Sequence, residues 1–373
     1  MPENRPDIAV YLYRLQGGGA ERVMVNLMQG FLQRGLKIDL VVNKKEGPLL
    51  TQVPSQVRII DLKAPKPWRN GLPKLMGYLQ KERPTALLTG LHYNNEIAIL
   101  AKRLAFASTR VVVSEHNTLS LRAKREKNEQ KSALTARLFY PFADAIVAVS
   151  QGVAKDLALV TGIPLKRIKT LYNPVILTEF IEKAKQPVDH PWFAPGEPPV
   201  ILAVGRLEEQ KDFPTLIKAF AIVRQVRPAK LVILGQGKEQ QKLNALVKEL
   251  GIENDVAFPG FTQNPYAYMA KASVFVLSSI EEGLPTVLIE AMAVGTPVVS
   301  TNCKSGPDQI LDNGKYGELV PVRDPDAIAD AILRILSGNA KSVPPAWLEQ
   351  YRLETVTQQY LDLLGISPTN SSC

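Results

Sequence analysis

The chain has 373 residues, of which 45% are hydrophobic and 22% are charged. This length predicts two domains with a sizeable core in each, and the composition is that of an ordinary globular protein. The first residues lack an apolar stretch, no apolar run approaches the ~20 residues that span a bilayer, and the cysteines are too few for a disulfide framework. These features argue against a secreted or membrane-spanning protein and predict a cytoplasmic one.

The formal net charge of +9 is unevenly distributed. Residues 1–175 hold 27 Lys and Arg against 13 Asp and Glu, which gives +14, whereas the remainder holds 18 against 23, which gives −5. A basic half suits an anionic partner, such as a membrane surface, nucleic acid or a phosphorylated substrate. A solvated basic surface that maintains solubility explains the same charge equally well.

Short apolar runs alternate with helical stretches along the first half of the chain. Near-continuous runs of this kind, separated by amphipathic segments, predict a parallel sheet covered by helices on both faces. The runs are IAVYLY (8–13), KIDLVV (37–42), VRIIDL (57–62), TALLTG (85–90), RVVVSE (110–115), DAIVAVS (144–150) and IKTLYN (168–173).

A proline-rich stretch at 183–199 has no periodicity, and the strand–helix alternation begins again after it. We therefore predict an α/β protein of two doubly wound, Rossmann-like domains facing a cleft, with ligands at the carboxyl ends of the strands. The second set of runs is VILAVG (200–205), KLVILG (230–235), VAFPGF (256–261), SVFVLS (273–278), TPVVS (296–300) and GELVPV (317–322). The predicted parts are a first domain at 1–175, a linker at 176–199, a second domain at 200–345 and a terminal helix at 346–366.

The first strand-to-helix corner reads QGGGAERVMVNL and includes Gly18 and Gly19. Glycines allow a ligand to approach the backbone closely, and the helix that follows offers unpaired N–H groups to an anion. The corner lacks the G-x-G-x-x-G pattern and a P-loop lysine, which argues against a dinucleotide or Walker site. A tight turn that needs glycine explains the same residues.

The second corner places His116 directly after strand 110–115. A histidine there can hydrogen-bond a substrate hydroxyl or phosphate, or it can be satisfied by nearby backbone. The basic run at 121–131 follows it, either as a solvated helix or as a surface that faces anionic lipid. The three histidines of the chain lie far apart, so we expect no metal site.

The third corner, GRLEEQKDF, places Arg206 and Lys211 in a short loop after strand 200–205. Two cations at a strand end suit a diphosphate, and arginine can make a forked contact with it. They can equally be surface cations balanced by the neighbouring acidic residues.

The fourth corner is EEGLPTVLIEAMAVG, in which Glu282 precedes an apolar helix that contains Glu290. Apolar residues on every side of Glu290 predict a buried helix, with Pro285 in its first turn. An unpaired carboxylate in an apolar environment costs several kcal/mol or more, so Glu290 must be neutral, paired or bound to a ligand.

Taken together, these corners resemble the retaining GT-B-fold glycosyltransferases of family 4 over nearly the whole chain. The marker is a Glu, seven residues and a second Glu, here Glu282 and Glu290, followed by Ala-Met-Ala-x-Gly. The GRL motif with a downstream Lys-Asp, the GGAER corner, VAFPGF and a His at the end of a first-domain strand complete the pattern. The resemblance implies a terminal helix that packs back toward the first domain.

The resemblance also implies a role for each site residue. Glu290 would accept the ribose hydroxyls of the donor nucleotide, and Glu282 would lie beside the transferred sugar. Backbone groups of Gly283, Leu284, Thr286 and Val287 would reach sugar and phosphate. The remaining implied roles are diphosphate binding for Arg206 and Lys211 beside Gly205, phosphate binding for Gly18 and Gly19, sugar contact for His116 and a border to the base for Phe258.

One position departs from the family pattern. Many members have E-G-F-G where this chain has E-G-L-P, so Pro285 offers no N–H donor. The N–H groups of Thr286 and Val287 remain at the start of the helix.

The implied reaction moves a sugar from a nucleotide-diphosphate sugar, such as a UDP-sugar, to a hydroxyl of a glycan or lipid-linked acceptor, with retention of anomeric configuration. Protein cations would replace a metal, and no cofactor or nucleic acid is expected. A peripheral contact with the anionic inner membrane face is a further expectation, in polysaccharide or glycolipid biosynthesis. A GT-B-fold nucleotide-sugar epimerase and a non-catalytic nucleotide-sugar-binding protein are the alternatives.

Overall fold

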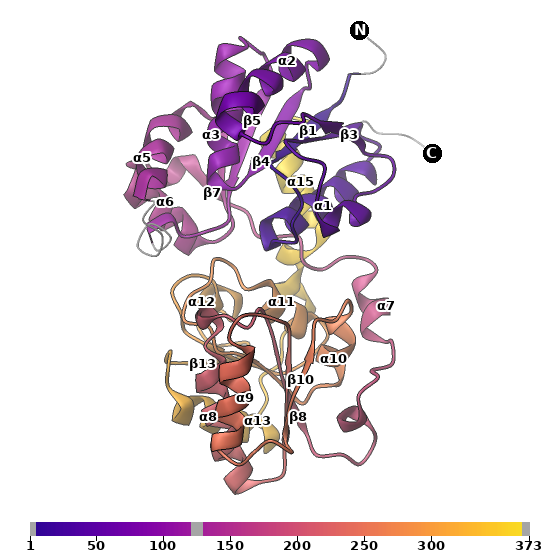
Figure 1. Ribbon diagram of the computed structural model, residues 1–373, viewed down its shortest axis with the longest axis vertical. Coiled ribbons are helices and arrows are strands. Elements are labelled where there is room, and N and C mark those ends of the chain that lie inside the picture. The colour runs from indigo at the N-terminus through magenta and orange to yellow at the C-terminus, as the bar shows by residue number, and fades with distance from the viewer. Residues whose placement is uncertain (1–4, 121–129, 368–373) are drawn as a thin grey trace. The chain divides into compact units, whose positions relative to one another are not determined.

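The computed structural model describes residues 5–120 and 130–367 (Figure 1). The chain divides into two compact units, the first made of residues 1–174 with 350–373 and the second of residues 175–349. The segment predicted as a linker, 176–199, is part of the second unit. Its short helix α7 (Phe180–Ala184) buries Phe180, whose ring lies 4.5 Å from that of Tyr266.

The first unit is built on a parallel seven-stranded sheet in the order β3-β2-β1-β4-β5-β6-β7. The strand order reverses between β1 and β4, which makes the carboxyl ends of these strands a topological switch point. The strands are β1 (Ile8–Leu12), β2 (Ile38–Val42), β3 (Arg58–Asp61), β4 (Ala86–Gly90), β5 (Arg110–Glu115), β6 (Ala145–Ala148) and β7 (Ile168–Thr170). The longer helices are α1 (Gly19–Leu32), α2 (Leu72–Glu82), α3 (His92–Leu104), α5 (Gln130–Phe139) and α6 (Gln151–Thr161).

The last helix of the chain, α15 (Leu353–Leu364), belongs to the first unit, where it packs against α1 (Figure 1). Its buried residues Val356, Tyr360 and Leu361 are part of the same hydrophobic core as β1 and β2. This position confirms the expectation that the terminal helix packs with the first domain.

The terminal helix is shorter than the predicted 346–366. A separate turn, α14 (Pro345–Leu348), is anchored in the second unit, where Trp347 donates from Nε1 to the carbonyl oxygen of Ile310 at 2.8 Å. Arg352 then has extended backbone before α15 begins. The interruption occurs where the chain passes from one unit to the other.

The second unit has a six-stranded sheet in the order β10-β9-β8-β11-β12-β13, and all its strand pairs are parallel. Its switch point lies between β8 and β11, so the loops after these two strands are neighbours at one edge of the sheet. The strands are β8 (Val200–Val204), β9 (Lys230–Leu234), β10 (Val256–Gly260), β11 (Val274–Leu277), β12 (Val298–Thr301) and β13 (Glu318–Val320). The helices include α8 (Phe213–Val226), α9 (Gln240–Glu249), α10 (Pro265–Lys271), α11 (Thr286–Ala293), α12 (Pro307–Ile310) and α13 (Pro325–Leu336).

Every apolar run named in the sequence contains a strand of these two sheets, except that β12 extends one residue beyond its run, to Thr301. The runs are rich in Val, Ile and Leu, and the inner strands β1, β4, β11 and β12 are buried at every position, as expected for a sheet covered on both faces. The predicted fold class, two Rossmann-like parallel-sheet domains, is confirmed.

Candidate active site

The two loops at the switch point of the second unit bring Lys211 and Glu282 together. Lys211 lies in the loop between β8 and α8, and Glu282 lies between β11 and α11. The Lys211 ammonium is 2.6 Å from Oε1 of Glu282, and the side chains are 17% and 10% exposed. Ser279 donates to the same oxygen at 2.7 Å. One carboxylate oxygen therefore receives a cation and a hydroxyl in a largely water-excluded position.

Further hydrogen bonds tie these two loops to each other. The hydroxyl of Ser278 donates to the carbonyl oxygen of Lys211 at 2.7 Å. The side-chain amide of Gln210 donates to the carbonyl oxygen of Glu281 at 2.9 Å. The N–H of Ile280 donates in turn to the carbonyl of Gln210. Sequence reasoning missed Ser278, Ser279 and Gln210, although small polar residues directly after a buried strand were an available signal.

Arg206, the other predicted diphosphate ligand, pairs with a different carboxylate. Its side chain is 72% exposed and pairs with Glu208 at 3.0 Å. The loop that carries it is held by the end of β9 and by the loop that follows, since Gly205 donates to the carbonyl of Leu234 at 2.9 Å and Leu207 donates to that of Gln236 at 3.0 Å. Gly235 has φ +136°, and a Cβ there would lie 1.9 Å from the Gly205 carbonyl oxygen. Only glycine at 235 allows this backbone contact.

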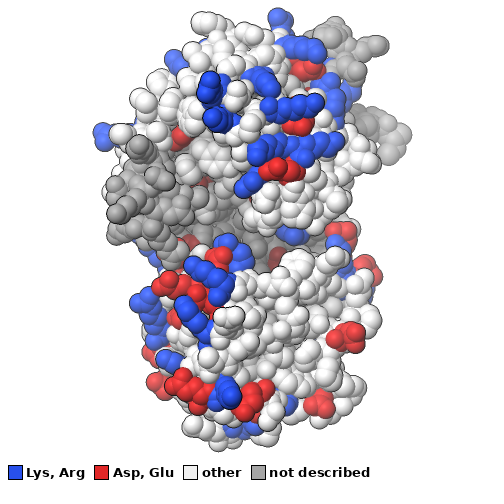
Figure 2. Space-filling view, in the orientation of Figure 1, with Lys and Arg blue, Asp and Glu red and all other residues white. Residues whose placement is uncertain are grey.

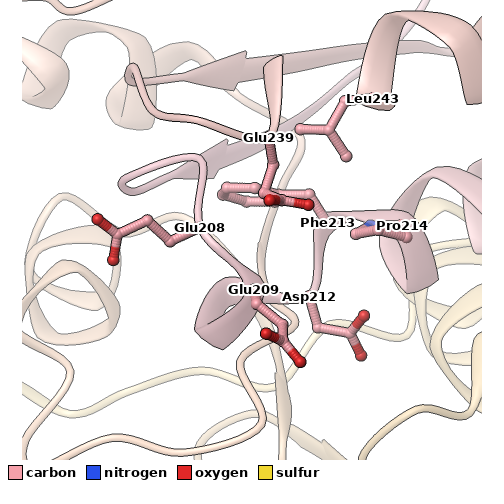
Figure 3. Close-up of a pocket in the computed structure, with 7 residues that line it drawn as sticks. All are labelled: Glu208, Glu209, Asp212, Phe213, Pro214, Glu239 and Leu243. Carbon is pink, nitrogen blue, oxygen red and sulfur yellow. The ribbon is translucent and has the colours of Figure 1, made fainter. Parts of the chain in front are cut away.

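A pocket of about 70 Å³ opens beside this loop, and it is acidic (Figure 3). The carboxylates that line it repel a diphosphate, so the pocket is unsuited to that ligand. In Figure 3 the Glu208 carboxylate points away from the other labelled ones. Burial raises the pKa of Asp212, which is the N-cap of α8. The lining residues are Glu208, Glu209, Asp212, Phe213, Pro214, Glu239 and Leu243.

Helix α11 differs from the prediction on one point, because it is not buried on every side. Leu288, Ile289 and Met292 are buried, whereas Val287, Glu290 and Val294 form a partly exposed stripe. Glu290 therefore lies on the half-open side of the helix, where a carboxylate stays partly solvated. The prediction was wrong because Val287 and Val294 on that side are apolar, and an apolar residue type does not show which side of a helix is buried.

The backbone groups predicted to bind sugar and phosphate lie at or just before the start of α11. Pro285 is the N-cap rather than a residue of the first turn, and α11 begins at Thr286. Thr286 and Val287 are thus its first two residues, whose N–H groups have no acceptor four residues earlier in a helix. Gly283 and Leu284 lie in the loop before it, and Leu284 is 8% exposed. Phe258, on β10, is partly buried against the core of the second unit.

In the first unit, the predicted phosphate-binding corner holds a carboxylate of its own. Gly18 is the N-cap of α1, and Gly19 is its first residue. The N–H groups of Gly17 and Gly18 donate to Oε2 of Glu21 at 2.8 and 3.1 Å. A phosphate that binds the Gly18 N–H must therefore displace Glu21, a residue that sequence reasoning did not single out.

His116 lies at the carboxyl end of β5 and is 8% exposed. Burial lowers the pKa of its imidazole to about 4, so the ring is neutral near pH 7. Its Nε2 is 3.1 Å from Oγ of Ser114, and its backbone N–H donates to Glu115. The basic run predicted at 121–131 lies, apart from the first residues of α5, outside the described residues.

Comparison with known proteins places this geometry in a family. The profile described as "Glycosyltransferase Family 4" matches residues 17–179, and the profile "Glycosyl transferases group 1" matches residues 185–345. Solved structures that the chain resembles have the GT-B architecture. The galactosyltransferase WaaB of the lipopolysaccharide outer core, in apo form, aligns with TM-score 0.74 and 22% identity over 96% of this chain and 98% of that one. Anabaena Alr3699/HepE, solved with UDP and glucose, aligns with TM-score 0.77 and 19% identity over 97% and 100%.

A relative in Campylobacter jejuni is 32% identical over 343 residues, which cover 89% of this chain and 90% of the relative. It is named N-acetylgalactosamine-N,N'-diacetylbacillosaminyl-diphospho-undecaprenol 4-alpha-N-acetylgalactosaminyltransferase. The lipopolysaccharide 1,6-galactosyltransferase of Salmonella typhimurium is 31% identical over 56% of this chain and 58% of its own length. The chain belongs to glycosyltransferase family 4, and it is a glycosyltransferase of the hexosyltransferase type.

Proposed function

We propose that the protein is a retaining glycosyltransferase that transfers a hexosyl group from a nucleoside-diphosphate sugar to a hydroxyl of a glycan or lipid-linked acceptor. The observation that carries the proposal is the Lys211–Glu282 pair at the switch point of the second unit, beside the start of α11. A cation and a carboxylate so placed suit the two ends of a sugar diphosphate. The Campylobacter relative is named for a diphospho-undecaprenol acceptor, and HepE was solved with UDP and glucose, which supports both substrates.

The proposed roles follow from the charge and exposure of each group. Lys211 and Arg206 stabilise the negative charge that develops on the departing diphosphate, together with the N–H groups of Thr286 and Val287. Glu282 then accepts hydrogen bonds from the sugar through the carboxylate that Lys211 and Ser279 hold in place. Glu290, on the partly exposed side of α11, remains accessible to the ribose hydroxyls.

The proposed reaction is a same-face substitution. The bond between the anomeric carbon and the diphosphate oxygen breaks, and the acceptor oxygen bonds that carbon on the same face. The acceptor proton passes to the departing phosphate oxygen, so no protein nucleophile is required. Protein cations and helix N–H groups take the part of a metal in this proposal.

The test is a panel of nucleotide sugars screened by thermal shift, because a ligand that binds the folded state raises its melting temperature. The stabilising donor is then incubated with glycan and lipid-linked acceptors, and the anomeric configuration of the product is read by NMR. An inverted product contradicts retention. An isomerised nucleotide sugar without acceptor indicates an epimerase, and binding without turnover over all acceptors indicates a binding protein.

We also propose that the first unit contacts an anionic membrane surface. This unit holds 28 Lys and Arg against 15 Asp and Glu, a formal charge of +13, and Figure 2 shows more basic than acidic atoms over its visible face. Leu134 and Leu138 of α5 are exposed, and the Arg103 guanidinium lies 4.2 Å from the ring centre of the exposed Phe142. Basic and apolar groups together suit a lipid surface. No helix among the described residues has the length and apolarity to cross a bilayer.

Flotation with anionic liposomes tests the membrane contact at low and at high salt. Leu138→Glu should weaken binding, whereas Val226→Glu, at an exposed apolar position of the second unit, should leave it unchanged. An absence of binding at low salt contradicts the proposal.

A further inference from the structure

A chain of buried polar groups connects the last helix of the protein to His116. The hydroxyl of Tyr360, on α15, lies 3.3 Å from Oγ of Ser114, and that Oγ lies 3.1 Å from Nε2 of His116. Tyr360 and Ser114 are both fully buried. Two residues that are 246 positions apart in the chain therefore form one hydrogen-bonded path to the histidine.

The ring and the backbone of His116 are held from several directions. Glu115 accepts from the N–H groups of His116 and Asn117 at 3.2 and 3.4 Å, and its other oxygen accepts from the Tyr140 hydroxyl at 2.8 Å. A Cβ at Gly90 would lie 3.3 Å from Nε2, so this glycine leaves room for the ring. The hydrogen bonds therefore fix the backbone at His116, whereas the buried ring is held by its contact with Ser114.

The tautomer of His116 depends on the direction in which the hydrogen bonds through Ser114 run. A fully buried phenol needs an acceptor for its proton, and Ser114 Oγ lies within reach of Tyr360. Ser114 then has its own proton to donate, and Nε2 of His116 is its neighbour. A neutral imidazole that accepts at Nε2 carries its proton on Nδ1.

We infer that Tyr360 and Ser114 are positioning residues that hold His116 as the Nδ1–H tautomer, so that Nδ1 presents a hydrogen-bond donor to the substrate. The inference rests on the proposed contact between His116 and the transferred sugar. It adds that the contact is a donated hydrogen bond from Nδ1 to a sugar oxygen. It also gives α15, through Tyr360, a role in positioning His116 for the reaction.

The tautomer is measured directly by NMR on the full chain labelled with ¹⁵N-histidine. The three histidines give three ring patterns, and His116→Gln identifies the one that belongs to His116. We expect a protonated Nδ1 and an unprotonated Nε2 near pH 7. Ser114→Ala and Tyr360→Phe should both increase the population of the Nε2–H form. A wild-type His116 protonated on Nε2, or a pattern unchanged in both variants, overturns the inference.

Tyr351→Phe is the matched control. Tyr351 is also fully buried and lies just before α15, but its hydroxyl has no hydrogen-bond partner among the described residues. Its loss should leave the His116 pattern and the turnover unchanged.

Activity is measured with the donor and acceptor that the screen identifies. Tyr360→Phe should lower kcat by about tenfold, with a smaller change in the KM for the nucleotide sugar. The reason is that a misplaced His116 N–H stabilises the transition state less well, whereas binding of the ground state depends less on it. Wild-type kcat in Tyr360→Phe, despite a changed His116 pattern, overturns the functional part of the inference. Wild-type kcat in His116→Gln would instead contradict the proposed contact between His116 and the sugar. A failure of the positioning role is therefore distinguishable from a failure of the sugar contact.

Discussion

The Lys211–Glu282 pair allows a structural role to be separated from a role in the reaction. Replacing Lys211 by Met leaves the Glu282 carboxylate in a mostly buried position without its cation. Loss of one partner costs about 3–5 kcal/mol in a fully buried pair and about 0–1 kcal/mol in an exposed one. The side chains are 17% and 10% exposed, and Ser279 still donates to Glu282. We therefore expect a loss of about 2 kcal/mol in the free energy of unfolding of the second unit.

The double variant Lys211→Met/Glu282→Gln removes both charges and should recover most of this stability, because a neutral amide needs no cation. Turnover should behave differently. Lys211→Met should lower kcat by about 10²–10³-fold, the effect of losing one group that stabilises charge in the transition state. The double variant should not recover it, since the diphosphate still lacks its cation.

The assay combines thermal melts with steady-state kinetics on all four members of the cycle. A loss of about 2 kcal/mol should lower the melting temperature of a unit of this size by about 4–8 °C. Recovery of kcat together with stability in the double variant would show that Lys211 only neutralises Glu282. That result would refute the proposed contact with the diphosphate.

Three other predictions concern separate parts of the molecule. Glu290→Gln should weaken binding of the donor nucleotide in calorimetry without unfolding the protein, whereas Glu249→Gln, at the exposed end of α9, should bind normally; equal affinities contradict the ribose contact. Gly235→Ala should destabilise the second unit by about 2–4 kcal/mol in denaturant titrations, because its Cβ meets the Gly205 carbonyl. Burial raises the pKa of Glu96 from 4.5 to about 7, so the unfolded chain loses this proton first, and the free energy of unfolding should fall as the pH rises between these values. The fall should be on the order of 3 kcal/mol, and a Glu96→Gln variant with the same pH dependence would disprove this origin.

The strands and the two-sheet architecture could be predicted from the sequence, because apolar β-branched runs of strand length leave few alternatives to a doubly covered parallel sheet. The corners at Gly18, Arg206 and Glu282 could be predicted for a related reason, since ligand-binding loops follow the carboxyl ends of strands.

Direction of burial and long-range contacts could not be predicted in the same way. The side of α11 that faces solvent depends on what packs against it, so Glu290 was expected in a buried environment. The Glu21 carboxylate at Gly18 and the path from Tyr360 to His116 depend on the folded arrangement of distant residues. The interruption at Arg352 lies where the chain passes between the two units, and local periodicity does not reveal this position.

The position of α15 in the first unit has a consequence for folding during synthesis. The core of this unit includes Val356, Tyr360 and Leu361, and the ribosome adds these residues only after the whole second unit. The core of the first unit therefore stays incomplete, with apolar surface exposed, while the second unit is translated. Segments that are exposed in this way favour association with chaperones and aggregation. A deletion that removes α15 should therefore destabilise the first unit more than the second, and it should lower the soluble yield of the chain.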